Sequence, residues 1–153
     1  MKKLMVLGVI ISLFSFQINA QSVETGVLPP SNSAEGQFTE WKKVEFTASG
    51  QPVSYEYRIA FMKRKALACN YEVQLKNTSG QKLSIKLTTH YYDKLVKDRF
   101  GDTFNESLKP EKDISFGIIT QGAKEDKEKK DQPDIERCLS CDFSYEINVD
   151  LDQ

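Results

Sequence analysis

The stretch FSYEINVDL, residues 143–151, alternates apolar and polar side chains along its whole length. A period of two is typical of a β-strand that buries one face in a core and leaves the other in water. The stretches YEVQL at 71–75 and LSIKL at 83–87 have the same period. None of the three keeps the three-to-four-residue spacing of an amphipathic helix, so together they predict a β fold.

Seven strand-like segments follow one another from residue 39 onward. Turn signals lie between several of them, such as SGQP at 49–52 and NTSG at 77–80. Short strands at regular spacing predict an all-β, immunoglobulin-like antiparallel β-sandwich, formed as a single domain by residues 39–151. The predicted strands are 39–47, 53–62, 66–76, 82–93, 98–104, 112–120 and 140–151.

The alternation also predicts a core and one strand pairing. We expect a hairpin around 77–80 in which Leu75 faces Leu83 and Cys69 faces Thr89, because a slip of one residue would put leucines against lysines. Within each predicted strand, the side chains expected to be mostly buried are the alternate residues that face the core. They are Trp41, Tyr57, Ile59, Tyr71, Val73, Leu75, Leu83, Ile85, Leu87, Ile114, Phe116, Phe143, Tyr145, Ile147 and Val149.

Residues 1–20 have the pattern of a signal peptide. Two lysines precede an apolar run at 4–16 that is short for a membrane-spanning helix, and the segment ends at Ala20. We therefore expect an exported protein, periplasmic or secreted, with no membrane span after cleavage. Residues 21–38 show no apolar period and are expected to be a flexible N-terminal segment.

The charge pattern gives little support for a nucleic-acid partner. The chain has 21 basic and 22 acidic residues, so it lacks the excess of positive charge that binds phosphates. Residues 122–137 concentrate charged side chains of both signs between two predicted strands. We expect this segment to be a long solvated loop.

The central part of the chain resembles a class of small immunoglobulin-like modules in exported bacterial proteins, the FxLYD-type domain. Three elements carry the resemblance over roughly residues 70–118: Asn77–Gly80 (NTSG), Tyr91–Asp93 (YYD) and Leu108–Pro110 (LKP). The resemblance implies a β-sandwich with a binding or accessory role rather than a reaction.

The three cysteines are Cys69, Cys138 and Cys141. Parity puts Cys69 and Cys141 on inward faces at one end of the sandwich, and export favours oxidised thiols. We therefore predict a disulfide between Cys69 and Cys141, with Cys138 as the alternative partner of Cys69 and a local Cys138–Cys141 bridge as the third option. A redox dithiol is disfavoured, because a strand and not a helix follows the CxxC pair.

A zinc site is the second possibility for these cysteines. Cys69, Cys138 and Cys141 together with His90 have the composition of a tetrahedral zinc site with three thiolates and one imidazole. His90 is the only histidine, and its parity is opposite to that of the inward Leu87 and Thr89. The sequence therefore favours a disulfide over a metal.

No catalytic motif accompanies these residues. The chain has no P-loop, dinucleotide-binding glycine pattern or HExxH motif, and no nucleophile motif lies beside His90. We expect no enzymatic activity and no cofactor. The expected function is an exported, non-catalytic binding or accessory module whose partner is an unknown protein or glycan. The alternative is a thiol- or zinc-dependent protein that uses Cys69, His90, Cys138 and Cys141.

Overall fold

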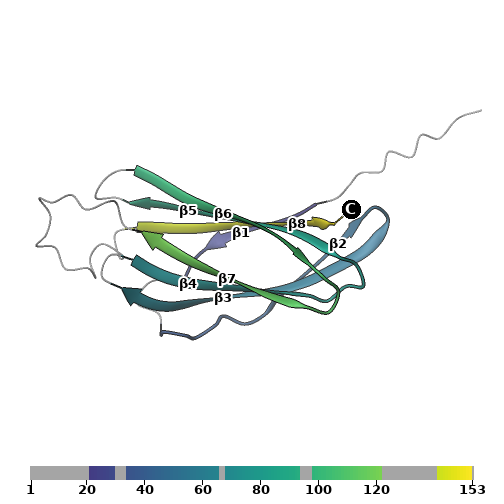
Figure 1. The fold of residues 1–153 in the computed structure, drawn as a ribbon, viewed down its shortest axis with the longest axis horizontal. Helices are drawn as coiled ribbons and strands as arrows, with labels where there is room; N and C mark the ends of the chain where they lie inside the picture. Colours follow the sequence, from purple (N-terminus) through teal and green to yellow (C-terminus); the bar gives the residue numbers. More distant parts are fainter. Residues whose placement is uncertain (1–20, 30–33, 66–67, 94–97, 122–140, 153) are drawn as a thin grey trace, which may run out of the picture.

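The computed structural model describes residues 21–29, 34–65, 68–93, 98–121 and 141–152. These residues form an all-β structure in which eight strands make two antiparallel, four-stranded sheets (Figure 1). The predicted single-domain β-sandwich is confirmed, with one strand more than expected. The expected signal peptide at 1–20 and the charged loop at 122–137 lie outside the described residues.

The two sheets are called sheet A and sheet B here, and all seven predicted strands occur in them within a few residues of the expected ends. Sheet A has the order β1 (Ser22–Val27), β8 (Cys141–Leu151), β5 (Leu83–Asp93) and β6 (Asp98–Leu108). Sheet B has the order β2 (Lys42–Ala48), β3 (Gln51–Lys65), β4 (Ala68–Asn77) and β7 (Asp113–Gln121).

The expected flexibility of residues 21–38 is wrong for their first part. Residues 22–27 form β1, which pairs with β8 along its whole length, and Leu28 behind it is buried. The prediction failed because β1 has an inverted pattern, with polar or small residues on its inner face and valines on its outer face. Val23 is 53% exposed and Val27 is 78% exposed.

The predicted hairpin around 77–80 is also wrong. β4 pairs with β3 and β7, whereas β5 pairs with β6 and β8, so this segment carries the chain from sheet B to sheet A. Leu75 lies opposite Tyr57, and Leu83 lies opposite Leu151. The inward faces were nevertheless predicted correctly, because alternation determines which face a residue occupies and not which strand is its neighbour.

The core lies between the two sheets and contains almost all of the side chains expected there. Ile114 is only half-buried, and the one clear error is Trp41, which is 39% exposed. Trp41 directly precedes β2 and contacts Arg58, which points outward from β3. It therefore lies on the outer face of sheet B rather than in the core.

The side chain of Asn77 fixes the crossing between the sheets. Its Nδ2 donates hydrogen bonds to the carbonyl oxygens of Gln81 (2.7 Å) and Leu108 (3.1 Å). Its Oδ1 accepts hydrogen bonds from the Ser79 N–H (2.9 Å) and hydroxyl (2.8 Å). Asn77 is fully buried, and every donor and acceptor of its amide is used. One side chain thus holds the end of β4, the turn before β5 and the end of β6 together.

Replacing Asn77 with Ala is expected to lower the free energy of unfolding by about 2–4 kcal/mol, because the buried Leu108 carbonyl loses its side-chain donor and the buried Ser79 loses its acceptor. Asn77→Asp keeps the acceptor for Ser79 but removes the donors, so it is expected to be similarly unstable. The measurement is urea unfolding followed by circular dichroism. The matched control is Asn105→Ala on the exposed face of β6, expected to change stability by less than about 0.5 kcal/mol. Equal effects of Asn77→Ala and Asn105→Ala would contradict this role of Asn77.

Candidate functional site

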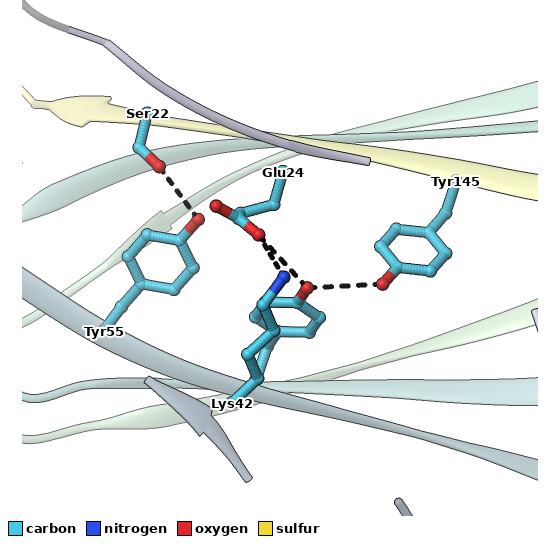
Figure 2. Close-up of polar contacts among 6 residues, drawn as sticks. Ser22, Glu24, Lys42, Tyr55 and Tyr145 are labelled. Atoms are coloured by element: carbon cyan, nitrogen blue, oxygen red, sulfur yellow. Dashed lines mark hydrogen bonds and ion pairs between the residues drawn. The ribbon is translucent and has the colours of Figure 1, made fainter. Parts of the chain in front are cut away.

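Polar side chains join one edge strand of each sheet, β1 of sheet A and β2 of sheet B (Figure 2). Nζ of Lys42 on β2 lies 2.5 Å from Oε2 of Glu24 on β1. The Tyr57 hydroxyl on β3 donates to the same carboxylate oxygen over 3.4 Å, and it lies 3.3 Å from the Tyr145 hydroxyl of β8. These four side chains connect four strands and both sheets.

A second polar contact joins the sheets nearby. The Ser22 hydroxyl of β1 lies 3.2 Å from the Tyr55 hydroxyl of β3, and both residues are buried (Figure 2). Ser22 and Glu24 alternate along β1 and both face sheet B, which explains why polar residues occupy the inner face of this strand. The inner face of β1 therefore pairs with tyrosine hydroxyls rather than with core hydrocarbon.

Gly26 determines where the ring of Tyr145 lies. Gly26 is paired with Tyr145 across β1 and β8. A Cβ atom on Gly26 would lie 2.5 Å from the Tyr145 hydroxyl oxygen and 2.6 Å from Cζ of its ring, closer than packed atoms approach. The tyrosine ring thus covers the glycine backbone, and this packing directs the hydroxyl toward Tyr57.

Three groups of this network, Lys42, Tyr55 and Tyr145, have pKa values shifted away from neutral pH. Burial raises the pKa of Tyr55 to about 12. Burial also raises the pKa of Tyr145, as does its hydrogen bond with Tyr57. The hydrogen bond to Glu24 raises the pKa of Lys42. At pH 7 the two phenols are therefore neutral and the amine is protonated, which suits hydrogen bonding and not proton abstraction.

An open groove of about 730 Å³ lies beside this network. Its lining includes Tyr57, Ile59 and Tyr145 from the strands, Pro29 from the segment after β1, and Glu40 from the segment before β2. The volume is within the roughly 300–1,000 Å³ of small-molecule sites, and the mixture of apolar surface with a few polar groups is also typical of them. This groove is the candidate binding site.

The cysteine residues are only partly described. Cys69 at the start of β4 is fully buried between the sheets, as predicted, and its side chain has a bonded partner. Figure 1 shows the starts of β4 and β8 at the same end of the sandwich. The side chains of Cys138 and Cys141 lie outside the described residues, so the predicted Cys69–Cys141 pair and its Cys138 alternative stay predictions.

His90 lies on the outer face of sheet A, where its side chain is exposed. Its neighbours on β5, Thr89 and Tyr91, are buried on the inner face. His90 and Cys69 therefore point in different directions, and the structure does not bring them together. Within the described ranges, no group of three or more His, Cys, Asp and Glu side chains is arranged to hold a metal ion.

Sequence reasoning missed most of this site. Tyr57 and Tyr145 were predicted as core residues, but their hydroxyl contacts and the roles of Glu24 and Lys42 were not. Residues 22–27, SVETGV, do alternate with a period of two. In this strand, however, the valines face solvent and Ser22, Glu24 and Gly26 face the other sheet. A strand with polar inner residues is expected where hydroxyl groups from the other sheet meet it.

Comparisons with known proteins give only distant structural likeness. No protein-family model and no curated protein matches the chain. The chain is similar to the Salmonella enterica trimeric lipoprotein SadB, at 9% identity and a TM-score of 0.36, over 73% of this chain and 60% of SadB. It is also similar to the CBM22-1–GH10 modules of Clostridium thermocellum xylanase 10B complexed with xylohexaose, at 8% identity and a TM-score of 0.34. That match covers 73% of this chain and 24% of the xylanase chain.

The chain thus spans less than two thirds of either structure, and TM-scores at this level show no family. The β-sandwich part of the FxLYD-type resemblance is confirmed by the fold, while membership of that family stays a prediction. The described residues include no helix with the length and apolar character of a membrane span.

Proposed function

We propose that the protein is an exported, non-catalytic binding module that holds its partner in the groove between β1 and β2. The observation that carries the proposal is the groove itself. It combines tyrosine rings and apolar side chains with a fixed hydrogen-bond network at its edge. Tyrosine is well suited to such a site, because it offers a large apolar surface and a polar tip at the same time.

The absence of catalysis is part of this proposal. The described groups that line the groove and have shifted pKa values, Lys42 and Tyr145, are shifted so that each keeps its proton at neutral pH. A general base or an activated nucleophile needs a shift in the other direction. Export is supported by the signal-like residues 1–20. The partner is a protein or glycan segment that fits an open groove.

Site-specific photo-crosslinking in the native envelope tests the groove. A photoreactive residue at Thr39, which lines the groove and is exposed, is expected to give a discrete crosslinked species. The matched control is the same residue at Thr103, which is exposed on β6 at the other edge of sheet A. A crosslink from Thr103 equal to that from Thr39, or none from Thr39, would contradict the proposal.

We also propose that a Cys69–Cys141 disulfide joins the two sheets at the end opposite the 77–80 crossing. The proposal is supported by the burial of Cys69 and by the shared position of the starts of β4 and β8. A bridge that closes a loop of roughly 70 residues contributes about 4 kcal/mol in the chain-entropy model. The zinc alternative needs His90 beside Cys69, and the outward position of His90 disfavours it.

Peptide mapping without reduction distinguishes the pairings in the exported protein. The expected product is a peptide pair that contains Cys69 and Cys141, with Cys138 alkylated as a free thiol. A Cys69–Cys138 pair would show that Cys138 is the partner of Cys69, and a Cys138–Cys141 pair would contradict a bridge between the sheets. Three free thiols together with one zinc ion per chain, measured by elemental analysis, would refute the disulfide and support the thiol- or zinc-dependent alternative.

A further inference from the structure

Arg58 on the outer face of sheet B is held by two aromatic rings. Its Cζ lies 4.4 Å from the centroid of the Phe38 ring and 4.4 Å from the centroid of the Trp41 ring. Its Nε also donates a 2.8 Å hydrogen bond to Oε1 of Gln74 on β4, directly opposite. The two rings and the Gln74 amide together hold the guanidinium group in one orientation.

The hydrogen bonds continue from Arg58 across the sheet. Gln74 Nε2 donates to Glu72 Oε1 over 2.7 Å, and the Ser115 hydroxyl of β7 donates to the same oxygen over 2.8 Å. We call Trp41, Arg58, Gln74, Glu72 and Ser115 the Arg58 row. The row crosses β3, β4 and β7 and is roughly 10 Å long over these three strands, since neighbouring strands lie about 4.8 Å apart.

The Arg58 row has unused binding capacity. Arg58 has five N–H donors, and among the described residues only its Nε hydrogen has a hydrogen-bond acceptor. No carboxylate of the described residues forms an ion pair with it. Trp41 beside it is 39% exposed. Because the guanidinium group is already held in place, a ligand that binds to its free donors beside the exposed indole costs little further side-chain entropy.

We propose that the Arg58 row binds an acidic polysaccharide, with a uronic acid carboxylate on Arg58 and the apolar face of a sugar ring on Trp41. A carboxylate matches the planar fork of the guanidinium group and accepts two parallel hydrogen bonds from it. The second N–H of the Gln74 amide can donate to a sugar hydroxyl, and the Ser115 hydroxyl oxygen, whose own hydrogen is donated to Glu72, can accept from one. This site lies on the outer face of sheet B and does not depend on the groove between β1 and β2.

The position of the row favours a glycan over an acidic peptide. The row is centred on β3 and β4, the two inner strands of sheet B. The backbone groups of inner strands are already paired, so the strands that carry Arg58 and Gln74 offer no open edge for a peptide backbone, and only Ser115 lies on the edge strand β7. A peptide that lay on this face would leave its own N–H and C=O groups without partners from the sheet. A sugar chain has no such backbone groups.

Trp41 is the only tryptophan in the chain, so intrinsic fluorescence reports directly on the row. The exported protein is titrated with trigalacturonate, with neutral maltotriose and with polyglutamate. Trigalacturonate is expected to change the Trp41 emission in a saturable manner, and to bind several-fold more weakly when the salt is raised from 0.1 M to about 0.5 M. Maltotriose and polyglutamate are expected to leave the emission unchanged.

Variants then assign the binding to Arg58. Arg58→Gln is expected to weaken trigalacturonate binding at least about tenfold. Arg58→Lys keeps the charge but lacks the planar fork, and is expected to weaken binding to a smaller extent. The matched control is Lys43→Gln on the same face, where Lys43 is exposed and paired with Glu45. This control is expected to bind like the parent protein.

Several outcomes would overturn the proposal. They are an unchanged Trp41 emission with trigalacturonate, an equal response to maltotriose, and an equal loss of binding in Lys43→Gln and Arg58→Gln. Tighter binding of polyglutamate would assign the row to an acidic protein instead. If Arg58→Gln does not fold, as judged by circular dichroism, the Arg58→Lys variant decides, and parent-like binding by it contradicts the proposal.

Discussion

The ring of Tyr145 packs on the backbone of β1 at Gly26, and this contact keeps the first strand in the sandwich. β1 is a short strand at the edge of sheet A, and β8 would be the edge without it. An edge strand with unpaired backbone groups invites pairing with other chains. An aromatic ring that covers a glycine on a neighbouring strand is a known way to hold such an edge. The groove depends on this contact too, because the end of β1 forms part of it.

The polar network around Tyr145 acts through geometry more than through energy. The Lys42–Glu24 pair is partly exposed and belongs to a class that contributes roughly 0–1 kcal/mol. Most of the stability comes from the apolar side chains between the sheets, where Tyr71, Leu75 and Ile147 are almost fully buried. The network instead determines which edge strands face each other and where the tyrosine hydroxyls point. This role explains why a strand with polar inner residues closes an apolar core.

Much of the fold could be predicted from alternation alone. The seven strands and the inward side of each central strand follow from the period of two in segments such as 71–75, 83–87 and 143–151. Strand neighbours could not be predicted, because alternation is the same whether a turn joins two strands of one sheet or crosses to the other. The buried amide of Asn77 determines that crossing, and its partners are spread over residues 79–108.

The candidate sites were less visible in the sequence. Glu24 and Arg58 occupy positions that look like ordinary solvated charges, and their partners come from other strands. Trp41 was predicted as core from the period of two, although its parity is opposite to that of Val44 and Phe46, which pack against the core. Long-range contacts such as Glu24 with Tyr57 cannot be read from local spacing.

The most direct test of this account compares two glycine substitutions. Gly26→Ala places a Cβ atom within 2.5 Å of the Tyr145 side chain, whereas Gly117→Ala on the exposed face of β7 places one with no atom within 4 Å. In urea unfolding, Gly26→Ala is expected to lower the free energy of unfolding by about 1–3 kcal/mol, because the ring must move from its packed position. Gly117→Ala is expected to change it by less than about 0.5 kcal/mol. Equal effects of the two substitutions would contradict the claim that Tyr145 holds β1 in the sandwich.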